Sequence, residues 1–343
     1  MKIKKVILIL VAILIVLLAG FAIFKSGENK KRDTNKIQVV ASNFASYDFL
    51  RAIIGENENV ELTFLLGPGK DAHSYEPTSQ DLVTIQNADL FVYVGGEMEQ
   101  WADKVLDSLD TKNTKIICIA DSVDTIEEQE IDGAEEHEHE HEHDEDENEN
   151  EGEQHEHEHE HEHEEGAFDE HIWTSPSNAI KMVNSLEKAM EEIDGNNAKK
   201  YKENADKYIA QIKDVDSKIQ EIVDNKVRDR LIFADKMPMQ YFIDYYDLEV
   251  SAAFSGCSTE TEPSAKTIAY LLNKVKTDKI PVVLYIELNN GKVAKTIAEE
   301  VGNGCEAMQI QTLHNVSLDD FNKGETWVSL MTRNLVVLKK ALQ

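Results

Sequence analysis

Short apolar runs alternate with amphipathic segments along most of this chain, and this alternation constrains the fold more than any other feature. Four runs of strand length precede residue 120, four more follow residue 230, and segments with helical spacing separate them. Such an order is typical of βαβ units, which build mostly parallel sheets flanked by helices. The predicted strands are residues 37–41, 60–66, 90–94 and 115–119, then 231–234, 249–253, 282–286 and 307–310. The predicted short helices are residues 47–54, 79–88, 98–109, 239–246, 264–276, 292–301 and 326–342.

Two further helices are predicted between the halves. Ser175 can cap the first, with Pro176 at its first position. The second covers residues 198–223, where apolar residues recur at steps of three and four. It would extend about 39 Å at 1.5 Å per residue, long enough for a rigid connection between lobes. We therefore predict an α/β fold of two lobes with small, mostly parallel sheets. Its parts are an N-terminal lobe (37–195), a linking long helix (196–225) and a C-terminal lobe (226–343).

Residues 127–165 interrupt the first half with an acidic, histidine-rich tract. It holds 22 of the 66 acidic residues and no Lys or Arg, so the net charge outside it is only −9 of the total −31. The tract lacks apolar periodicity and cannot bury a core, so we interpret it as disordered. A polyanionic segment argues against a nucleic-acid partner and favours cations. Nine of the chain's 12 histidines lie in it: His137, His139, His141, His143, His155, His157, His159, His161 and His163.

The tract has the composition of a weak metal-collecting loop. In an extended chain its alternating imidazoles point to one side and its carboxylates to the other. Neighbouring carboxylates favour protonated imidazole, yet a divalent metal can displace that proton near neutral pH. Zinc or nickel fits better than copper(I), because the tract has no thiolates. The alternative interpretation is an acidic solubilising linker.

The N-terminus combines basic residues with a long apolar run. Lysines precede an unbroken apolar run of 19 residues at 6–24, just long enough to span a bilayer. Phe21 stands where a lipoprotein cleavage box would have its Cys, and no small-x-small cleavage site follows. We predict an uncleaved membrane anchor at 1–25 and a polar spacer at 26–36, with the remainder outside the cytoplasm. Secretion after signal cleavage is the alternative.

Three cysteines give little further constraint. Cys118 lies in an apolar run and is predicted to be a buried strand residue. Cys257 and Cys305 can form a disulfide in an oxidising compartment, or remain free.

Only three histidines lie outside the tract: His73, His171 and His314. A single loop histidine is usually a solvated side chain, so the argument depends on all three together. Neutral imidazole is the commonest nitrogen ligand for zinc, and three ligands plus a fourth group complete a tetrahedral site. We hypothesise that the three meet at one metal. Ligands of such sheets bind beyond the carboxyl ends of the strands, where His73, Asp235, Glu287 and His314 are predicted to lie.

Several segments, in this order, resemble the zinc-binding solute-binding proteins of bacterial ABC importers. They are residues 71–78 (DAHSYEPT), 88–96 (ADLFVYVGG), the histidine-rich tract, 169–173 (DEHIW) and 262–264 (EPS). The resemblance covers nearly everything from residue 37 to residue 342. It implies two α/β lobes joined by a long rigid helix, with one metal held in the cleft between the lobes.

The resemblance also bears on the ligand set. His73 and His171 match the family's first two ligands. Lys236 stands where the family has a third ligand, a His or Glu, and a protonated Lys has no lone pair for a metal. His314 falls where the family has an Asp before the final helix. The chain thus resembles a variant subgroup with a three-histidine site.

The fourth ligand of such a variant stays open. Asp235, Glu262 or water is the candidate, while Lys236 pairs with a carboxylate instead. Glu262 can equally be a solvated residue before the next helix.

The resemblance implies a monomeric, extracytoplasmic protein that captures Zn(II) and delivers it to an ABC permease and its ATPase in the membrane. Manganese or iron capture is one alternative, although three histidines and the tract argue against it. A metal-buffering surface adhesin is another. A zinc hydrolase with Glu170 or Glu262 as general base is disfavoured, because no His-Glu-x-x-His helix motif is present. We therefore expect no enzymatic activity.

Overall fold

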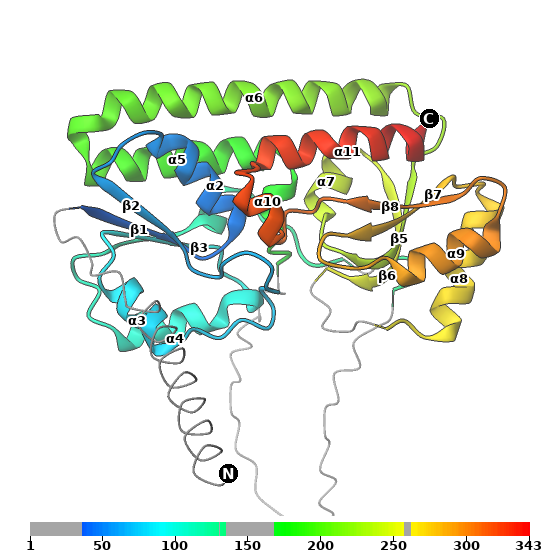
Figure 1. Cartoon of the computed structure of the whole chain (residues 1–343), viewed down its shortest axis with the longest axis horizontal. Helices are drawn as coiled ribbons and strands as arrows, with labels where there is room; N and C mark the ends of the chain where they lie inside the picture. Colours follow the sequence, from blue (N-terminus) through cyan, green and yellow to red (C-terminus); the bar gives the residue numbers. More distant parts are fainter. Residues whose placement is uncertain (1–35, 130, 135–167, 257–261) are drawn as a thin grey trace, which may run out of the picture. The chain divides into compact units, whose positions relative to one another are not determined.

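Two four-stranded parallel sheets form the framework of the chain, one in each half of the sequence (Figure 1). The computed structural model describes residues 36–129, 131–134, 168–256 and 262–343, and residues 37–343 form one compact unit. The strand orders, β2-β1-β3-β4 and β6-β5-β7-β8, follow the same topology. The strands are β1 Ile37–Ala41, β2 Val60–Phe64, β3 Leu90–Tyr93, β4 Lys115–Cys118, β5 Arg230–Met237, β6 Glu249–Ser255, β7 Val282–Ile286 and β8 Glu306–Ile310.

All eight predicted strands are present and all their pairings are parallel, which confirms the α/β class. The largest difference is in β5, which extends beyond the predicted residues 231–234. Its pairing with β6 shifts register between Phe233 and Lys236. The extension carries Asp235 and Lys236, and their polar side chains interrupt the apolar run from which the strand was predicted. Both are nevertheless buried, so β5 delivers two charged groups into the interior.

The predicted helices are also present, with shifted ends. They are α2 Phe44–Ile54, α3 Ser79–Gln86, α4 Gln100–Ser108, α5 Pro176–Ile193, α6 Ala198–Asp224, α7 Gln240–Tyr245, α8 Ala265–Thr277, α9 Lys292–Val301 and α11 Trp327–Leu342. Helix α10, Leu318–Asn322, was not predicted, because five residues are too few to show a periodic pattern. The available sequence signal for this helix was its N-cap residue, Ser317. The Ser317 side chain accepts a hydrogen bond from Asp320 N at 3.1 Å.

Helix α6 lies along α5 and α11 and connects the two halves in sequence (Figure 1). Its apolar stripe, which includes Tyr208, Ile212 and Ile219, is buried. Helix α11 in turn contacts β5, β7 and β8 of the second sheet. The long helix predicted at 198–223 is therefore present with nearly the same bounds.

A single apolar cluster includes residues from both halves, with two tryptophans at its centre. Trp173 and Trp327 are fully buried. Trp327 Nε1 donates to Trp173 O at 2.9 Å, and Trp173 Nε1 donates to Thr312 O at 3.0 Å. Buried indole N–H groups need such partners, and here the partners join η3 (Ile172–Thr174), α11 and the loop after β8. That loop carries His314.

The cysteines and the N-terminal segment complete the comparison with the sequence. Cys118 ends β4 and is half-buried, so the strand is as predicted while the burial is only partial. Cys305 is free, but Cys257 lies outside the described residues, and the disulfide stays a prediction. In the part of the chain that the structure describes, no helix has the length and apolarity of a membrane span. The anchor predicted at 1–25 and the spacer up to residue 35 fall outside that part.

Candidate metal centre

His73 lies in the loop between β2 and α3, which is bonded to the other half of the chain. Gly67 and Gly69 adopt positive φ angles of 73° and 76°, a conformation open to glycine at little cost. Gly69 N donates to Val316 O at 2.8 Å, and the Asn315 side chain donates to the carbonyls of Gly67 and Lys70. These bonds hold the loop of His73 against the loop of His314.

His314 lies in the loop between β8 and α10. Both Glu287 carboxyl oxygens hold this loop, because they accept hydrogen bonds from Thr312 N at 2.7 Å and Thr312 Oγ1 at 2.8 Å. Leu313, which precedes the histidine, is fully buried with φ 60°. A left-handed conformation is costly for a leucine, by about 1–2 kcal/mol. The surrounding hydrogen bonds fix this strained turn, and the turn sets the direction of the His314 side chain.

His171 precedes η3 and is fully buried. One carboxyl oxygen of Asp169 accepts from His171 N at 2.8 Å and contacts His171 Nδ1 at 3.0 Å. The Asp169 carbonyl accepts from Tyr241 OH at 2.7 Å, so an element of the second half also supports this turn. A carboxylate on Nδ1 fixes the imidazole tautomer and leaves Nε2 as the ligand atom.

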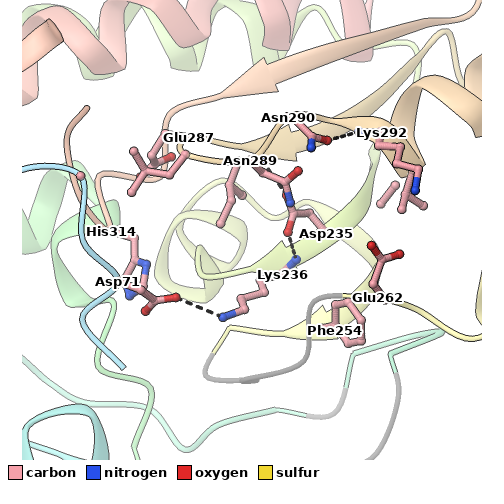
Figure 2. A pocket seen from close by; sticks show the side chains of 15 residues that line it. Asp71, Asp235, Lys236, Phe254, Glu262, Glu287, Asn289, Asn290, Lys292 and His314 are labelled. Carbon is pink, nitrogen blue, oxygen red and sulfur yellow. Dashed lines mark hydrogen bonds and ion pairs between the residues drawn. The ribbon is translucent and has the colours of Figure 1, made fainter. Parts of the chain in front are cut away.

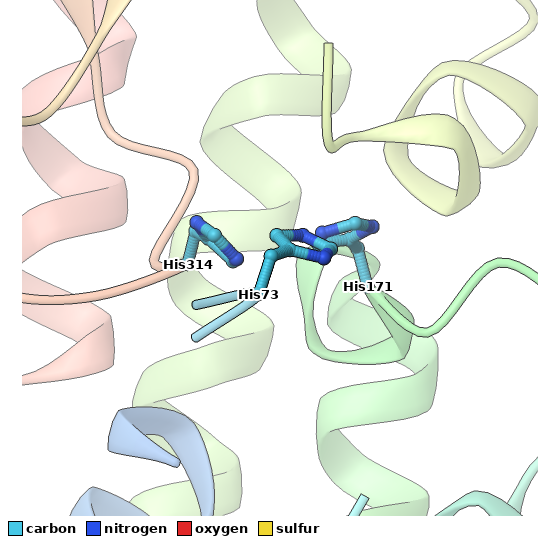
Figure 3. Close-up of side chains that lie close together, drawn as sticks. All are labelled: His73, His171 and His314. Atoms are coloured by element: carbon cyan, nitrogen blue, oxygen red, sulfur yellow. The ribbon is translucent and has the colours of Figure 1, made fainter. Parts of the chain in front are cut away.

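The three rings converge on one point (Figure 3). One ring nitrogen from each of His73, His171 and His314 lies within 4.8 Å of the others, and among the described residues this is the one group of metal-binding side chains with such spacing. The Nε2 atom of each ring is buried without a hydrogen-bond partner in the described chain. Buried polar atoms are normally paired. Three neighbouring rings with unpaired nitrogens therefore have the arrangement of a metal-binding site.

The protonation states of the rings suit a cation. Burial, with the nearby His171, lowers the pKa of His73 to about 4. Burial also holds the pKa of His314 well below its usual value. For His171 burial acts in the same direction, but Asp169 outweighs it and raises the pKa. Two rings thus present free lone pairs at neutral pH, and His171 is the ring whose proton a metal would have to displace.

The other predicted ligands line a cavity beside His314 and do not join the histidine cluster (Figure 2). The Asp235 carboxyl accepts hydrogen bonds from Lys236 N at 2.8 Å and Ile286 N at 3.1 Å. Glu287 is engaged by Thr312, as described above. Glu262 is exposed and lies on the cavity wall. Lys236 pairs with a carboxylate, as predicted, since its Nζ lies 3.6 Å from Asp71 Oδ2.

Comparison with known proteins now identifies the family. The sequence pattern of the ZnuA family, described as "Zinc-uptake complex component A periplasmic", matches residues 39–341. The chain belongs to this family.

Two curated relatives show how the match extends. The high-affinity zinc uptake system protein ZnuA of Bacillus subtilis is 30% identical over 329 residues, which cover 96% of this chain and 94% of the relative. The zinc-binding lipoprotein AdcA of Streptococcus pneumoniae strain R6 is 30% identical over 313 residues. Those residues cover 91% of this chain but only 57% of that relative. The chain thus spans little more than half the length of AdcA.

Solved structures agree with the fold. The Zn(II)-bound ZnuA-like domain of S. pneumoniae AdcA matches with a TM-score of 0.69 at 26% identity, covering 90% of this chain and 99% of the domain. The metal-dependent lipoprotein YcdH of B. subtilis matches with a TM-score of 0.70 at 25% identity and the same coverage. Members of the family are solute-binding proteins of ABC transporters and not enzymes. The expected absence of catalytic activity is therefore confirmed, and the hydrolase alternative is set aside.

Two supporting groups of the candidate site were missed from the sequence. Asp169 was quoted only as part of a motif, although an Asp two residues before a candidate ligand was the available signal. Asp71, which accepts from His73 N at 2.9 Å and pairs with Lys236, has the same spacing before His73. The nine histidines of the tract, residues 137–163, lie outside the described residues.

Proposed function

We propose that this chain is the extracytoplasmic solute-binding component of an ABC importer, which captures Zn(II) through His73, His171 and His314. The observation that carries the proposal is the convergence of three histidines, each of which offers a ring nitrogen within 4.8 Å of the others and has a buried, unpaired Nε2. Relatives described as zinc-binding and zinc-uptake proteins support it.

The donor set favours zinc over manganese. Imidazole suits zinc, whereas manganese prefers carboxylate, carbonyl and water oxygens. Three nitrogens form the cluster, and the carboxyl groups of Asp235 and Glu287 already accept hydrogen bonds from the protein. Iron capture is disfavoured by the same donors.

In this proposal the ion lies in a cleft between an N-terminal lobe at 37–195 and a C-terminal lobe at 226–343. His73 and His171 come from the first part of the chain, and His314 comes from the second. A small movement of one lobe would separate His314 from the other two rings and weaken the site. Docking on a permease and its ATPase would supply the energy for that release.

The histidine-rich tract would collect metal weakly and raise its local supply, and the N-terminal segment would tether a monomer to the membrane. One observation supports the role of the tract. Glu127 and Phe168 form an antiparallel bridge that brings the flanks of the tract together. Phe168 is only three residues from His171, so metal held by the tract would begin its path close to the cluster.

The test uses residues 37–343, which form a compact unit, with the nine tract histidines replaced by serine. Zn(II) and Mn(II) are titrated against a chelator of known affinity, with His314→Ala in parallel. We expect one tight zinc per chain and a loss of at least about 100-fold in His314→Ala, since one of three ligands is removed. Tight zinc binding that survives His314→Ala would refute the three-histidine site. Preferential Mn(II) binding would refute zinc as the cargo.

A further inference from the structure

A cavity of about 440 Å³ opens directly beside the histidine cluster, and His314 is one of its walls (Figure 2). Its volume is in the range of small-molecule sites. The C-terminal part of strand β5, the loop after β7 and the start of α9 form most of the wall. The cavity is therefore larger than a bare ion requires.

Three histidines leave a tetrahedral ion one position short. Among the described residues no carboxyl group joins the cluster to supply it. The Asp235 carboxyl is held by two backbone N–H groups, and the Glu287 carboxyl is held by Thr312. Among the described residues none completes the site, so its fourth position is open to water or to a ligand from outside this part of the chain.

Lys236 places a positive charge at this open side. Its side chain is only 10% exposed and extends toward Asp71, on the His314 side of the cavity (Figure 2). A buried ammonium next to a cation site weakens binding of a bare ion. The same ammonium favours an ion that arrives with an anionic ligand.

The remaining wall favours a ligand of mixed charge over a simple anion. The exposed carboxylate of Glu262 lies on the cavity wall with Lys236, and amide groups of Asn289 and Asn290 lie beside them. The N-terminal end of α9, at Lys292, adds positive potential. Both an amino and a carboxylate group would find partners there.

We propose that this cavity binds a small zinc chelator of the amino-acid class, so that the ion is captured as a complex and not alone. The carboxylate of the chelator pairs with Lys236 and completes the coordination of the ion held by His73, His171 and His314. This inference rests on the proposed zinc function.

The probe is radiolabelled L-histidine, a zinc chelator that carries one carboxylate. The full chain is loaded with half an equivalent of zinc per chain, so that the tightest site fills first. Equilibrium dialysis then measures retained L-histidine, and atomic absorption measures zinc in the same chamber. We expect about one L-histidine for each bound zinc and none without metal. Imidazole, which offers a ring nitrogen but no carboxylate, should compete poorly.

Variants distinguish the role of Lys236 from the effects of removing any partly buried lysine or of unfolding the chain. Lys236→Met should still bind zinc, but its affinity for L-histidine should fall at least tenfold. Lys236→Arg should retain the affinity for L-histidine. Lys274→Met is the matched control, because Lys274 is also partly buried and paired with acidic groups but lies outside the cavity. It should behave like the parent chain. Melting temperatures of all variants check that each one is folded.

Four results would overturn the inference. Zinc retained without L-histidine would refute the chelator site and leave the zinc function standing. Equal retention in the parent chain and Lys236→Met would remove the assigned carboxylate partner. Retention that persists in His314→Ala would place the complex on the histidine tract. A chain that holds no tight zinc would refute this inference together with the proposed function.

Discussion

Replacing Asp169 tests whether the cluster binds metal through His171 Nε2. One Asp169 oxygen accepts from His171 N and also contacts Nδ1, all within buried surroundings. Asp169→Asn keeps an oxygen at this place but removes the charge. Asp169→Ala removes the acceptor as well and leaves two buried N–H groups without a partner. The two variants therefore separate the effect of charge from the effect of orientation.

The magnitude follows from the role of such a residue. Loss of a carboxylate that supports a ligating histidine typically lowers metal affinity about 10–100-fold, or about 1.4–2.7 kcal/mol. We expect Asp169→Asn near the lower end, because the ring stays oriented, and Asp169→Ala near the upper end. The pH dependence has a definite sign. Asp169 raises the pKa of His171 against the effect of burial, so its removal lets the ring lose its proton at lower pH. The loss of zinc affinity in Asp169→Asn should therefore be largest at alkaline pH and become smaller as pH falls.

Chelator competition with residues 37–343 and serine at the nine tract positions measures this effect between pH 6 and pH 8. Asp206→Asn is the control, because Asp206 is an exposed acid on α6 far from the cluster in sequence. Zinc affinity that is unchanged in both Asp169 variants would show that His171 is not held as a ligand in this way. A loss of zinc affinity that becomes larger toward acid pH would contradict the conclusion that Asp169 raises the pKa of His171.

Two further predictions concern stability. Burial raises the pKa of Glu99 to about 7 from 4.5, so the folded chain binds this proton more tightly than the unfolded chain. The unfolding free energy should therefore fall by up to about 3 kcal/mol as pH rises through this range. Urea unfolding of Glu99→Gln at pH 5 and pH 8 should show a smaller fall, and an identical fall would refute the assignment. Asp48 is fully buried and accepts hydrogen bonds from Tyr208, Arg51 and Trp327 N. Asp48→Ala should lower the unfolding free energy by about 3–5 kcal/mol in the same assay. Asp206→Ala, which breaks an exposed ion pair with Lys202, should lower it by under about 1 kcal/mol. Similar decreases in the two variants would contradict the role of the buried Asp48 hydrogen bonds.

Periodicity predicted the framework well because both sheets are buried and parallel. Strands such as Val282–Ile286 are continuous apolar runs, and α6 keeps its apolar stripe over its whole length. The strand predicted at 231–234 is shorter than β5 because Asp235 and Lys236 interrupt the apolar pattern, although Lys236 still pairs with Phe254 of β6. Their burial depends on hydrogen bonds to distant elements, such as Ile286 N, which no local pattern reveals.

For the site, sequence reasoning found the three histidines by scarcity but had no means to rank the fourth ligand. The sequence left Asp235, Glu262 and water open as the fourth ligand, and it placed Asp235 and Glu287 at strand ends. The structure distinguishes them by their partners. Glu287 is bound to Thr312 and supports the His314 loop, Asp235 is bound to backbone N–H groups, and Glu262 is exposed on the cavity wall. Competition among hydrogen-bond partners decides which carboxyl group remains available for a metal, and that competition is settled in three dimensions.

Lys236 gives the site its distinct character. At the proposed site Lys236 stands where the resemblance implies a His or Glu ligand, so its ammonium group would both remove a donor and add a positive charge beside the ion. Asp71 offsets that charge only in part, because their contact is 3.6 Å long and Asp71 is 46% exposed. A metal site with a neighbouring uncompensated cation binds a bare divalent ion less tightly than one without it. Natural binding at this site is therefore best explained if an anionic group accompanies the ion, since it would satisfy the open coordination position and Lys236 at once.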